Sequence, residues 1–317
     1  MGCSLNRERL YSLLHFPVKR KPHRPLPSVA VSNSLAIHKQ RKLVIASALD
    51  TGNQVGPFGN LNYLAEKYLF SYFAFEPPYL TYHRVDADGR LVQTEPIEIP
   101  NMVMMHDFNV TRNHVVFMDL PLTFKLEAVG DGALPFRFDR DAGARLGVMP
   151  RDGSNSDVVW YEIDPCYVFH PVNSHEEGDN LVLHVARLES AFGESADDYS
   201  ASGCLWRWTI DPIAGTVKEE QLDDRAGDFG RIDDRLVGLP ARYGYLMSLP
   251  DTRRDYVEYG ETLYKYDLTT GQRWDHELGS GVKGGEPVCA PAGPWASDAS
   301  TSDAVSYTHL RAHETLR

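Results

Sequence analysis

Short runs of strand-forming residues, each joined to the next by a turn that ends in glycine, recur along the chain and constrain its fold more than any other feature. The runs are YLTYHRVDADGRLVQTEPIEI, FDRDAGARLGVMPRDG, WRWTIDPIAGTVKEEQL and LYKYDLTTGQRWDHEL. Glycine supplies the positive φ that tight turns need. Because β-forming residues on both sides of such a turn are typical of a hairpin, the chain is predicted to be mostly antiparallel β.

The turn glycines Gly89, Gly143, Gly215 and Gly271 lie at intervals of 54, 72 and 56 residues. These intervals are too uneven for a strict repeat, but they suit one hairpin in each blade of a β-propeller with loops of variable length. Helical periodicity is scarce, and the aromatic segment 68–75 favours a strand over a helix. The sequence therefore predicts an all-β fold, with a propeller favoured over a sandwich.

The composition excludes several classes of protein. Hydrophobic residues make up 42% of the 317 residues and charged residues 24%, which is typical of a globular protein with an ample core. The net charge of −12 argues against nucleic acid as the main partner. No window approaches the roughly 18 consecutive apolar residues of a membrane helix. The four cysteines are far apart and unpaired in sequence, which predicts a cytoplasmic protein.

Both ends of the chain differ from its middle. Residues 1–45 contain nine Lys or Arg and a single acid, a net charge of +8, so the rest of the chain carries a net charge of −20. We interpret residues 1–65 as a leader that is non-native or divergent, in preference to a basic targeting arm. Residues 303–317 resemble translated adaptor DNA and are set aside. The predicted propeller domain is then residues 66–302.

Two histidines stand in strongly apolar surroundings. His106 lies in VMMHDF, where a strand would place it on one face with Met104 and Phe108. His170 follows the aromatic run YVF. Each is readily explained as a buried histidine with a hydrogen bond, but two imidazoles on inner strands of a propeller could also bind a metal ion on its axis. Imidazole suits iron, copper, nickel or zinc, so the ligands do not choose the metal.

The chain resembles a known family, the carotenoid cleavage oxygenases, which include lignostilbene and apocarotenoid dioxygenases. The resemblance covers about residues 66–291. It is carried by these motifs in order: EPPYLTYHRVDADGRL, MMHDF, VVFMDLPLTF, PFRFDRDAGARLGVMPRDG, DPCYVFHPVNSHEEGD, GDFGRIDDRLVG with ARYGY, and GEPV. So many ordered matches are very improbable by chance.

The resemblance implies a seven-bladed propeller, incomplete here, with a cap of loops and helices. It implies a non-haem Fe(II) held by four histidines, which activates O2 to split a conjugated C=C bond of a carotenoid or apocarotenoid into two carbonyl products. By motif, His106 and His170 are two of the iron ligands. Glu286 in GEPV and Asp228 in GDFGR match carboxylates that orient ligand histidines. No catalytic residue is expected beyond these.

The chain departs from the family pattern in three places. The usual GEFPR reads GDFGR here, so Asp228 is one methylene shorter than glutamate. The first ligand histidine should fall near Pro57, and His38 lies too early to replace it. The fourth ligand follows GEPV in the family and has no counterpart here. We therefore expect this chain to be an inactive fragment of an oxygenase.

Other functions stay open beside this one. The same family includes enzymes that cleave lignostilbene or stilbene. A propeller hydrolase of the lactonase type would instead hold calcium with oxygen ligands, and a propeller that only binds a partner would need neither histidine. For the oxygenase, the expected partners are O2 and a hydrophobic conjugated molecule, whose uptake would suit a peripheral contact with a membrane.

Overall fold

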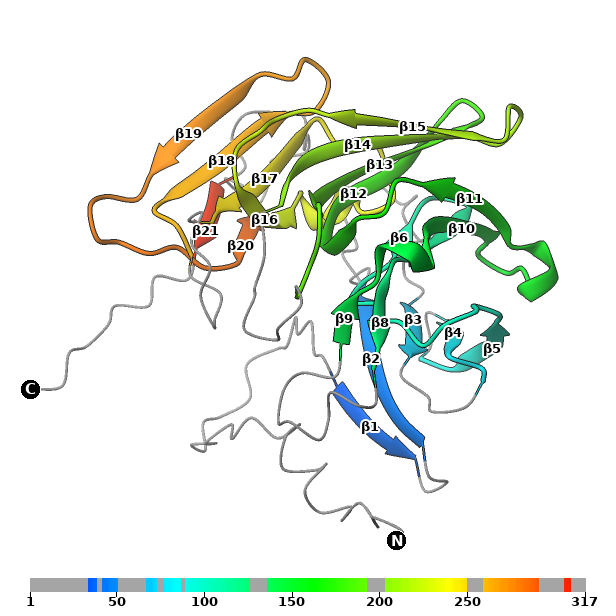
Figure 1. Ribbon diagram of the computed structural model, residues 1–317. Coiled ribbons are helices and arrows are strands. Elements are labelled where there is room, and N and C mark those ends of the chain that lie inside the picture. Colours follow the sequence, from blue (N-terminus) through cyan, green and yellow to red (C-terminus); the bar gives the residue numbers. More distant parts are fainter. Residues whose placement is uncertain are drawn as a thin grey trace, which may run out of the picture. The chain divides into compact units, whose positions relative to one another are not determined.

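The computed structural model shows regular secondary structure that is almost wholly β-strand in the residues it describes (Figure 1). It describes residues 34–38, 42–50, 67–72, 77–86, 89–125, 136–192, 203–249, 259–290 and 305–308. The helices in these ranges are three short 3-10 turns, η3 (Arg140–Ala142), η4 (Asn155–Asp157) and η5 (Asp234–Leu236). Every strand pair in these ranges is antiparallel, as the hairpin pattern predicts.

The strands form sheets whose members follow one another along the chain. The five-stranded sheet contains β1 (Ser34–His38), β2 (Lys42–Asp50), β3 (Lys67–Tyr72), β4 (Leu80–Val85) and β5 (Leu91–Ile97) in that order. Two of its strands, β1 and β2, lie in the segment expected to be a leader. The boundaries of that segment stay a prediction.

Three four-stranded sheets follow. The strands of the second and third are again consecutive along the chain, and those of the first are consecutive except for a small ribbon that intervenes in the middle of the sheet. The first contains β6 (Asn109–Val110), β7 (His114–Asp119), β10 (Ala144–Pro150) and β11 (Val159–Ile163). The second contains β12 (Tyr167–Glu177), β13 (Asn180–Leu188), β14 (Cys204–Asp211) and β15 (Thr216–Gln221). The third contains β16 (Gly227–Arg231), β17 (Tyr243–Ser248), β18 (Thr262–Asp267) and β19 (Arg273–Glu277). The described ranges also hold two small ribbons: β8 (Leu122–Phe124) with β9 (Phe136–Phe138), and β20 (Pro287–Ala290) with β21 (Val305–Thr308).

Neighbouring sheets contact each other first strand to first strand and last strand to last strand, which is the arrangement of propeller blades. The first strands contact one another in succession: β6 meets β12, β12 meets β16, and β16 meets β20. At the opposite edge, β11 meets β15. The first strand of each sheet is therefore the inner one, and the all-β propeller class is confirmed.

Two of the blade hairpins close with the same device. Asp211 ends β14, and its side chain accepts the backbone N–H groups of Ile213 and Ala214. Asp267 ends β18 and accepts those of Thr269 and Thr270 in the same way. The glycine that follows each turn, Gly215 or Gly271, has φ of 71° or 74°. A short acceptor at the strand end and a glycine four residues later thus fix the turn.

The hairpin predicted around Gly143 is wrong. Gly143 does have a positive φ of 73°, but it follows η3 rather than joining two paired strands. The strand before it, β9, pairs with β8, and the strand after it, β10, pairs with β7 and β11. The local pattern predicts the turn correctly, but the partners of the strands are chosen by packing far away in the sequence.

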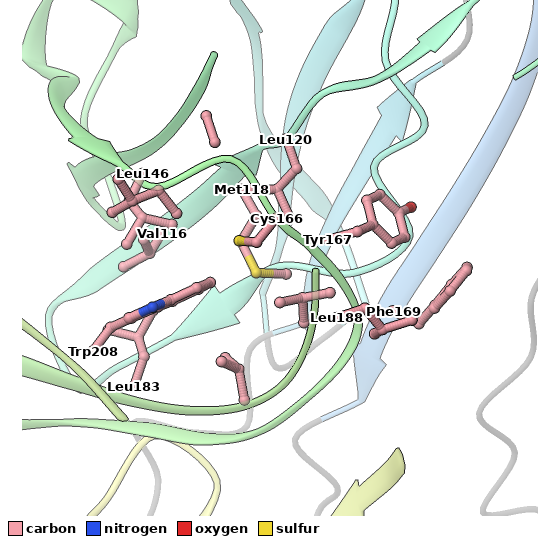
Figure 2. Packing of buried hydrophobic residues seen from close by; sticks show 14 of the residues in the cluster. Val116, Met118, Leu120, Leu146, Cys166, Tyr167, Phe169, Leu183, Leu188 and Trp208 are labelled. Atoms are coloured by element: carbon pink, nitrogen blue, oxygen red, sulfur yellow. The ribbon is translucent and has the colours of Figure 1, made fainter. Parts of the chain in front are cut away.

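The main core lies between the first and second four-stranded sheets (Figure 2). β7 shows why its sequence is so continuously apolar. Val116 and Met118 face this core, while Val115 and Phe117 face a second cluster on the other side of the sheet. Since successive strand residues point to opposite faces, a strand between two cores needs apolar residues at every position. No helix in the described ranges is long and apolar enough to cross a membrane.

Candidate metal centre

His106 lies three residues before an inner strand rather than within one. Residues 104–108 form no ladder, and β6 begins at Asn109. The predicted face is also wrong: Phe108 packs in the same apolar cluster as Met105 instead of sharing a face with His106. The N–H of Met104 donates to the carbonyl of Leu122 in the short strand β8, but from Met105 to Phe108 no strand pairing imposes regular alternation.

His170 is the fourth residue of β12, which continues through Glu177 rather than ending at the histidine as its position after YVF suggests. The pairing of β12 with β13 is irregular on both sides of Pro171. Such bulges re-aim side chains beside functional sites. The histidine is therefore carried by a locally kinked inner strand, with its side chain 21% exposed.

The structure brings these two histidines together. Their ring centroids are 4.9 Å apart and the ring planes meet at 79°. Nδ1 of His106 lies 3.1 Å from the carbonyl oxygen of Phe169, to which it donates. Nδ1 of His170 lies 3.1 Å from Oδ1 of Asp228, although its N–H is not aligned well enough for a full hydrogen bond.

The electrostatic surroundings of the two rings differ. Burial and the neighbouring imidazole of His170 lower the pKa of His106 to about 4, so this ring is neutral at pH 7. Burial by itself would lower the pKa of His170 too, but the carboxylates of Asp228, Asp107 and Glu286 raise it above its ordinary value. The acidic side chains therefore make His170 the more basic of the two rings.

The two predicted carboxylates occupy different places. Asp228 is 5% exposed and touches His170, as described above. Glu286 has a half-exposed side chain, and Oε2 lies 3.5 Å from the guanidinium of Arg231. Its negative charge acts on His170 at longer range. A direct positioning role for Glu286 stays a prediction.

Asp107 is a member of this group to which the sequence alone assigns no role. Loss of hydration raises the pKa of its carboxyl group to about 6, while the N–H of Phe108 and the charges of His170 and Arg231 act in the opposite direction. Its Oδ1 accepts the N–H of Phe108 at 2.8 Å. The charge of Asp107 thus acts on His170 in the same direction as the charges of Asp228 and Glu286.

Within the ranges that the structure describes, no group of three or more His, Cys, Asp or Glu side chains is arranged to hold a metal ion. The donor set nevertheless suits one. Since Nδ1 of His106 carries the proton donated to Phe169, Nε2 keeps a lone pair. Oδ1 of Asp228 lies at a similar distance from Nδ1 of His170, and imidazole oriented by a carboxylate or carbonyl is the usual form of a metal-binding histidine.

Sequence comparison agrees with this geometry. The family described as RPE65, retinal pigment epithelial membrane protein, matches residues 63–308. Its matching members include the carotenoid cleavage oxygenases. The chain belongs to this family.

Three relatives illustrate the match. The carotenoid 9,10(9',10')-cleavage dioxygenase of Crocus sativus is 36% identical over 64% of this chain and 38% of its own length. The crystal structure of Pseudomonas brassicacearum lignostilbene dioxygenase has a TM-score of 0.63 and 26% identity, over 76% of this chain and 53% of that one. Cobalt-substituted Synechocystis apocarotenoid oxygenase has a TM-score of 0.59 and 23% identity, over 79% and 49%. The chain thus spans about half of these relatives or less.

Aromatic side chains surround the two histidines. Phe169 packs against His106 with ring centroids 5.4 Å apart, and Phe229 packs against His170 at 4.8 Å. Phe192 and Tyr259 extend these contacts outward, at 6.1 Å from Phe169 and 5.0 Å from Phe229. The sequence predicts Phe169 to be core or tunnel lining. It does not predict the place of Phe229, because that place depends on a bulge in β16.

Proposed function

We propose that the chain is part of a non-haem Fe(II) dioxygenase that cleaves a conjugated C=C bond of a carotenoid or apocarotenoid with O2, giving two carbonyl products. The observation that carries this proposal is the juxtaposition of His106 and His170, 4.9 Å apart on neighbouring blades, in a chain of this family. When bound, iron would supply the activation of O2.

The residues of the chain would hold the metal ion and accept the substrate. His106 and His170 would each offer Nε2 to the metal, with Phe169 and Asp228 fixing the opposite ring nitrogen. The aromatic surround would accept a flat, apolar conjugated molecule and limit access of water. Since the family resemblance assigns only two of four ligands to this chain, we expect no turnover by the chain alone.

The substrate class has a close alternative. A lignostilbene or stilbene is also flat, aromatic and conjugated, and a lignostilbene dioxygenase is among the solved structures that the chain resembles at 26% identity. The carotenoid proposal is favoured by the higher identity, 36%, to a carotenoid-cleaving relative. A propeller that serves only as a binding module is the second alternative, and it would require no pair of imidazoles.

Metal binding tests the proposal against these alternatives. The chain would be loaded anaerobically with Fe(II), separately with Ca²⁺, and compared with a His106→Ala/His170→Ala variant. We expect weak binding of Fe(II) that the double substitution abolishes, and no binding of Ca²⁺. Equal Fe(II) binding by both proteins would contradict the proposed ligands. Binding of Ca²⁺ alone would favour a hydrolase.

The cellular setting belongs to the same proposal. Cys166 and Cys204 are free thiols, as a reducing cytoplasm would leave them. A hydrophobic substrate would reach the site through peripheral contact with a membrane. The predicted domain division into residues 1–65, 66–302 and 303–317 likewise stays a proposal.

A further inference from the structure

A bulge in β16 distorts the strand beside the proposed metal centre. Asp228 pairs with Met247 and Arg231 with Tyr245, so the two residues between them, Phe229 and Gly230, share a single opposing residue. Phe229 has φ of 59°, a conformation that a bulky side chain rarely adopts. Backbone strain of this kind persists only where surrounding contacts enforce it, and it collects at functional sites.

The bulge lets two consecutive side chains reach one imidazole. In a regular strand, Asp228 and Phe229 would point to opposite faces. Here Oδ1 of Asp228 lies 3.1 Å from Nδ1 of His170, and the ring of Phe229 packs on the same imidazole with centroids 4.8 Å apart. Oδ1 of Asp228 also accepts the N–H of Phe229 at 2.7 Å, which fixes the carboxylate relative to the ring.

Gly230 sets the distance between β16 and the strand that carries His170. A Cβ atom at this position would lie 2.7 Å from Cγ2 of Val172, 2.9 Å from its Cα and 3.0 Å from the carbonyl oxygen of Pro171. Two of these atoms are backbone, so they could not move aside as a flexible side chain would. The backbones of β16 and β12 therefore meet directly here, within two residues of His170.

We propose that Gly230 is a positioning residue for His170, because it allows β16 to approach β12 closely enough for the short side chain of Asp228 to reach Nδ1. The two departures from the family's GEFPR pattern are then coupled: the carboxylate is one methylene shorter, and the residue two positions later has no side chain. The importance of this coupling for metal binding rests on the proposed function, but the coupling itself is a property of the folded chain.

Long-range ¹H–¹⁵N spectra of the whole chain at alkaline pH, where imidazoles are neutral, would test this through the tautomer of His170. A His170→Gln variant would assign the signals. The native chain should show His170 mainly with the proton on Nδ1.

Gly230→Ala should shift the population toward the Nε2–H form, because β16 is displaced. Asp228→Glu should do so as well, since the longer side chain does not fit at the native spacing. Combining the two substitutions should restore much of the Nδ1–H form.

Gly227→Ala is the matched control on the same strand. Its Cβ would approach Met247, Leu246 and Tyr264, at 3.2 Å or more, and none of these belongs to β12. It should lower thermal stability without changing the tautomer of His170. An unchanged tautomer in Gly230→Ala, or independent effects in the double variant, would overturn the inference. If Gly230→Ala does not fold, Asp228→Glu decides: an unaltered Nδ1–H form would overturn the inference equally.

The proposed function can fail separately. If the tautomer of His170 responds to the substitutions as expected but the parent chain fails to bind Fe(II), the metal centre is refuted and the role of Gly230 stands. Fe(II) binding lost in the His106→Ala/His170→Ala variant, together with a tautomer that ignores residue 230, would support the metal centre and refute the role of Gly230.

Discussion

At the scale of single residues, the sheet of β12 to β15 contains a buried pair of imidazoles away from the proposed metal centre. His175 on β12 and His184 on β13 lie with nearly parallel rings whose centroids are 6.2 Å apart. His184 is 3% exposed, and within the described part of the chain neither of its ring nitrogens has a hydrogen-bond partner. A protonated imidazole would be poorly solvated at this position, and Arg207 adds repulsion.

This pair should make the fold sensitive to mild acid. Burial, His175 and Arg207 lower the pKa of His184 to about 3. Below about pH 6.5 this imidazole is protonated in the unfolded chain but not in the folded chain. The free energy of unfolding is therefore highest above that pH and falls as the pH drops below it. The slope for one such group approaches about 1.4 kcal/mol per pH unit. Urea unfolding at pH 7 and pH 5 should show a larger loss for the native chain than for His184→Leu.

His276 provides the matched control, since it lies exposed on β19. His276→Leu should keep the native difference between the two pH values. The explanation would be wrong if His184→Leu and the native chain lost equal stability on acidification.

At the scale of elements, one carboxylate connects two adjacent blades through several hydrogen bonds. Glu176 on β12 accepts hydrogen bonds from Oγ1 of Thr111, the backbone and side-chain amides of Asn113, and Nδ1 of His114. Thr111 and Asn113 lie in the turn between β6 and β7, and His114 is the first residue of β7. Glu176 thus ties the turn of one blade to the inner strand of the next, although its polar sequence context favours a solvated turn.

Glu176→Gln should weaken this connection, because an amide replaces one accepting oxygen with a donor. We expect a loss of about 1–3 kcal/mol in the free energy of unfolding. The neighbouring Glu177→Gln is the control, since Glu177 is exposed at the end of β12. A similar loss for both variants would contradict the fastening role of Glu176.

The hairpin turns offer a test of backbone conformation without a test of packing. At Gly215, φ is 71° and a Cβ atom added there would have no neighbour within 4 Å, so a substitution meets strain but no clash. Gly215→Val should cost about 1–2 kcal/mol, and Gly215→Asn should cost less because asparagine tolerates this conformation. Thermal unfolding would measure both. Equal stability of the valine and native chains would disprove the need for glycine here.

At the scale of the whole molecule, sequence patterns predict what depends on neighbours in the chain and miss what depends on distant packing. The turns at Gly89, Gly215 and Gly271 could be predicted because the Asp, Gly and β-forming residues act locally. The pairing after Gly143 could not, since β10 chooses β7 across a long connection. In the candidate site, His106, His170 and Asp228 are found by motif, but the role of Phe229 and Gly230 depends on a bulge that no local pattern announces.

Binding of one metal ion by His106 and His170 together is what the proposed function requires. It can be tested by adding anaerobic, paramagnetic Fe(II) in small amounts to the ¹⁵N-labelled chain and following the imidazole signals, which detects even weak binding and also locates it. We predict that His106 and His170 broaden first and together, that His175, His184 and His276 follow only at higher metal concentration, and that substituting either ligand protects the other. Broadening that starts at other histidines, or that is unchanged in His106→Ala, would refute the shared site.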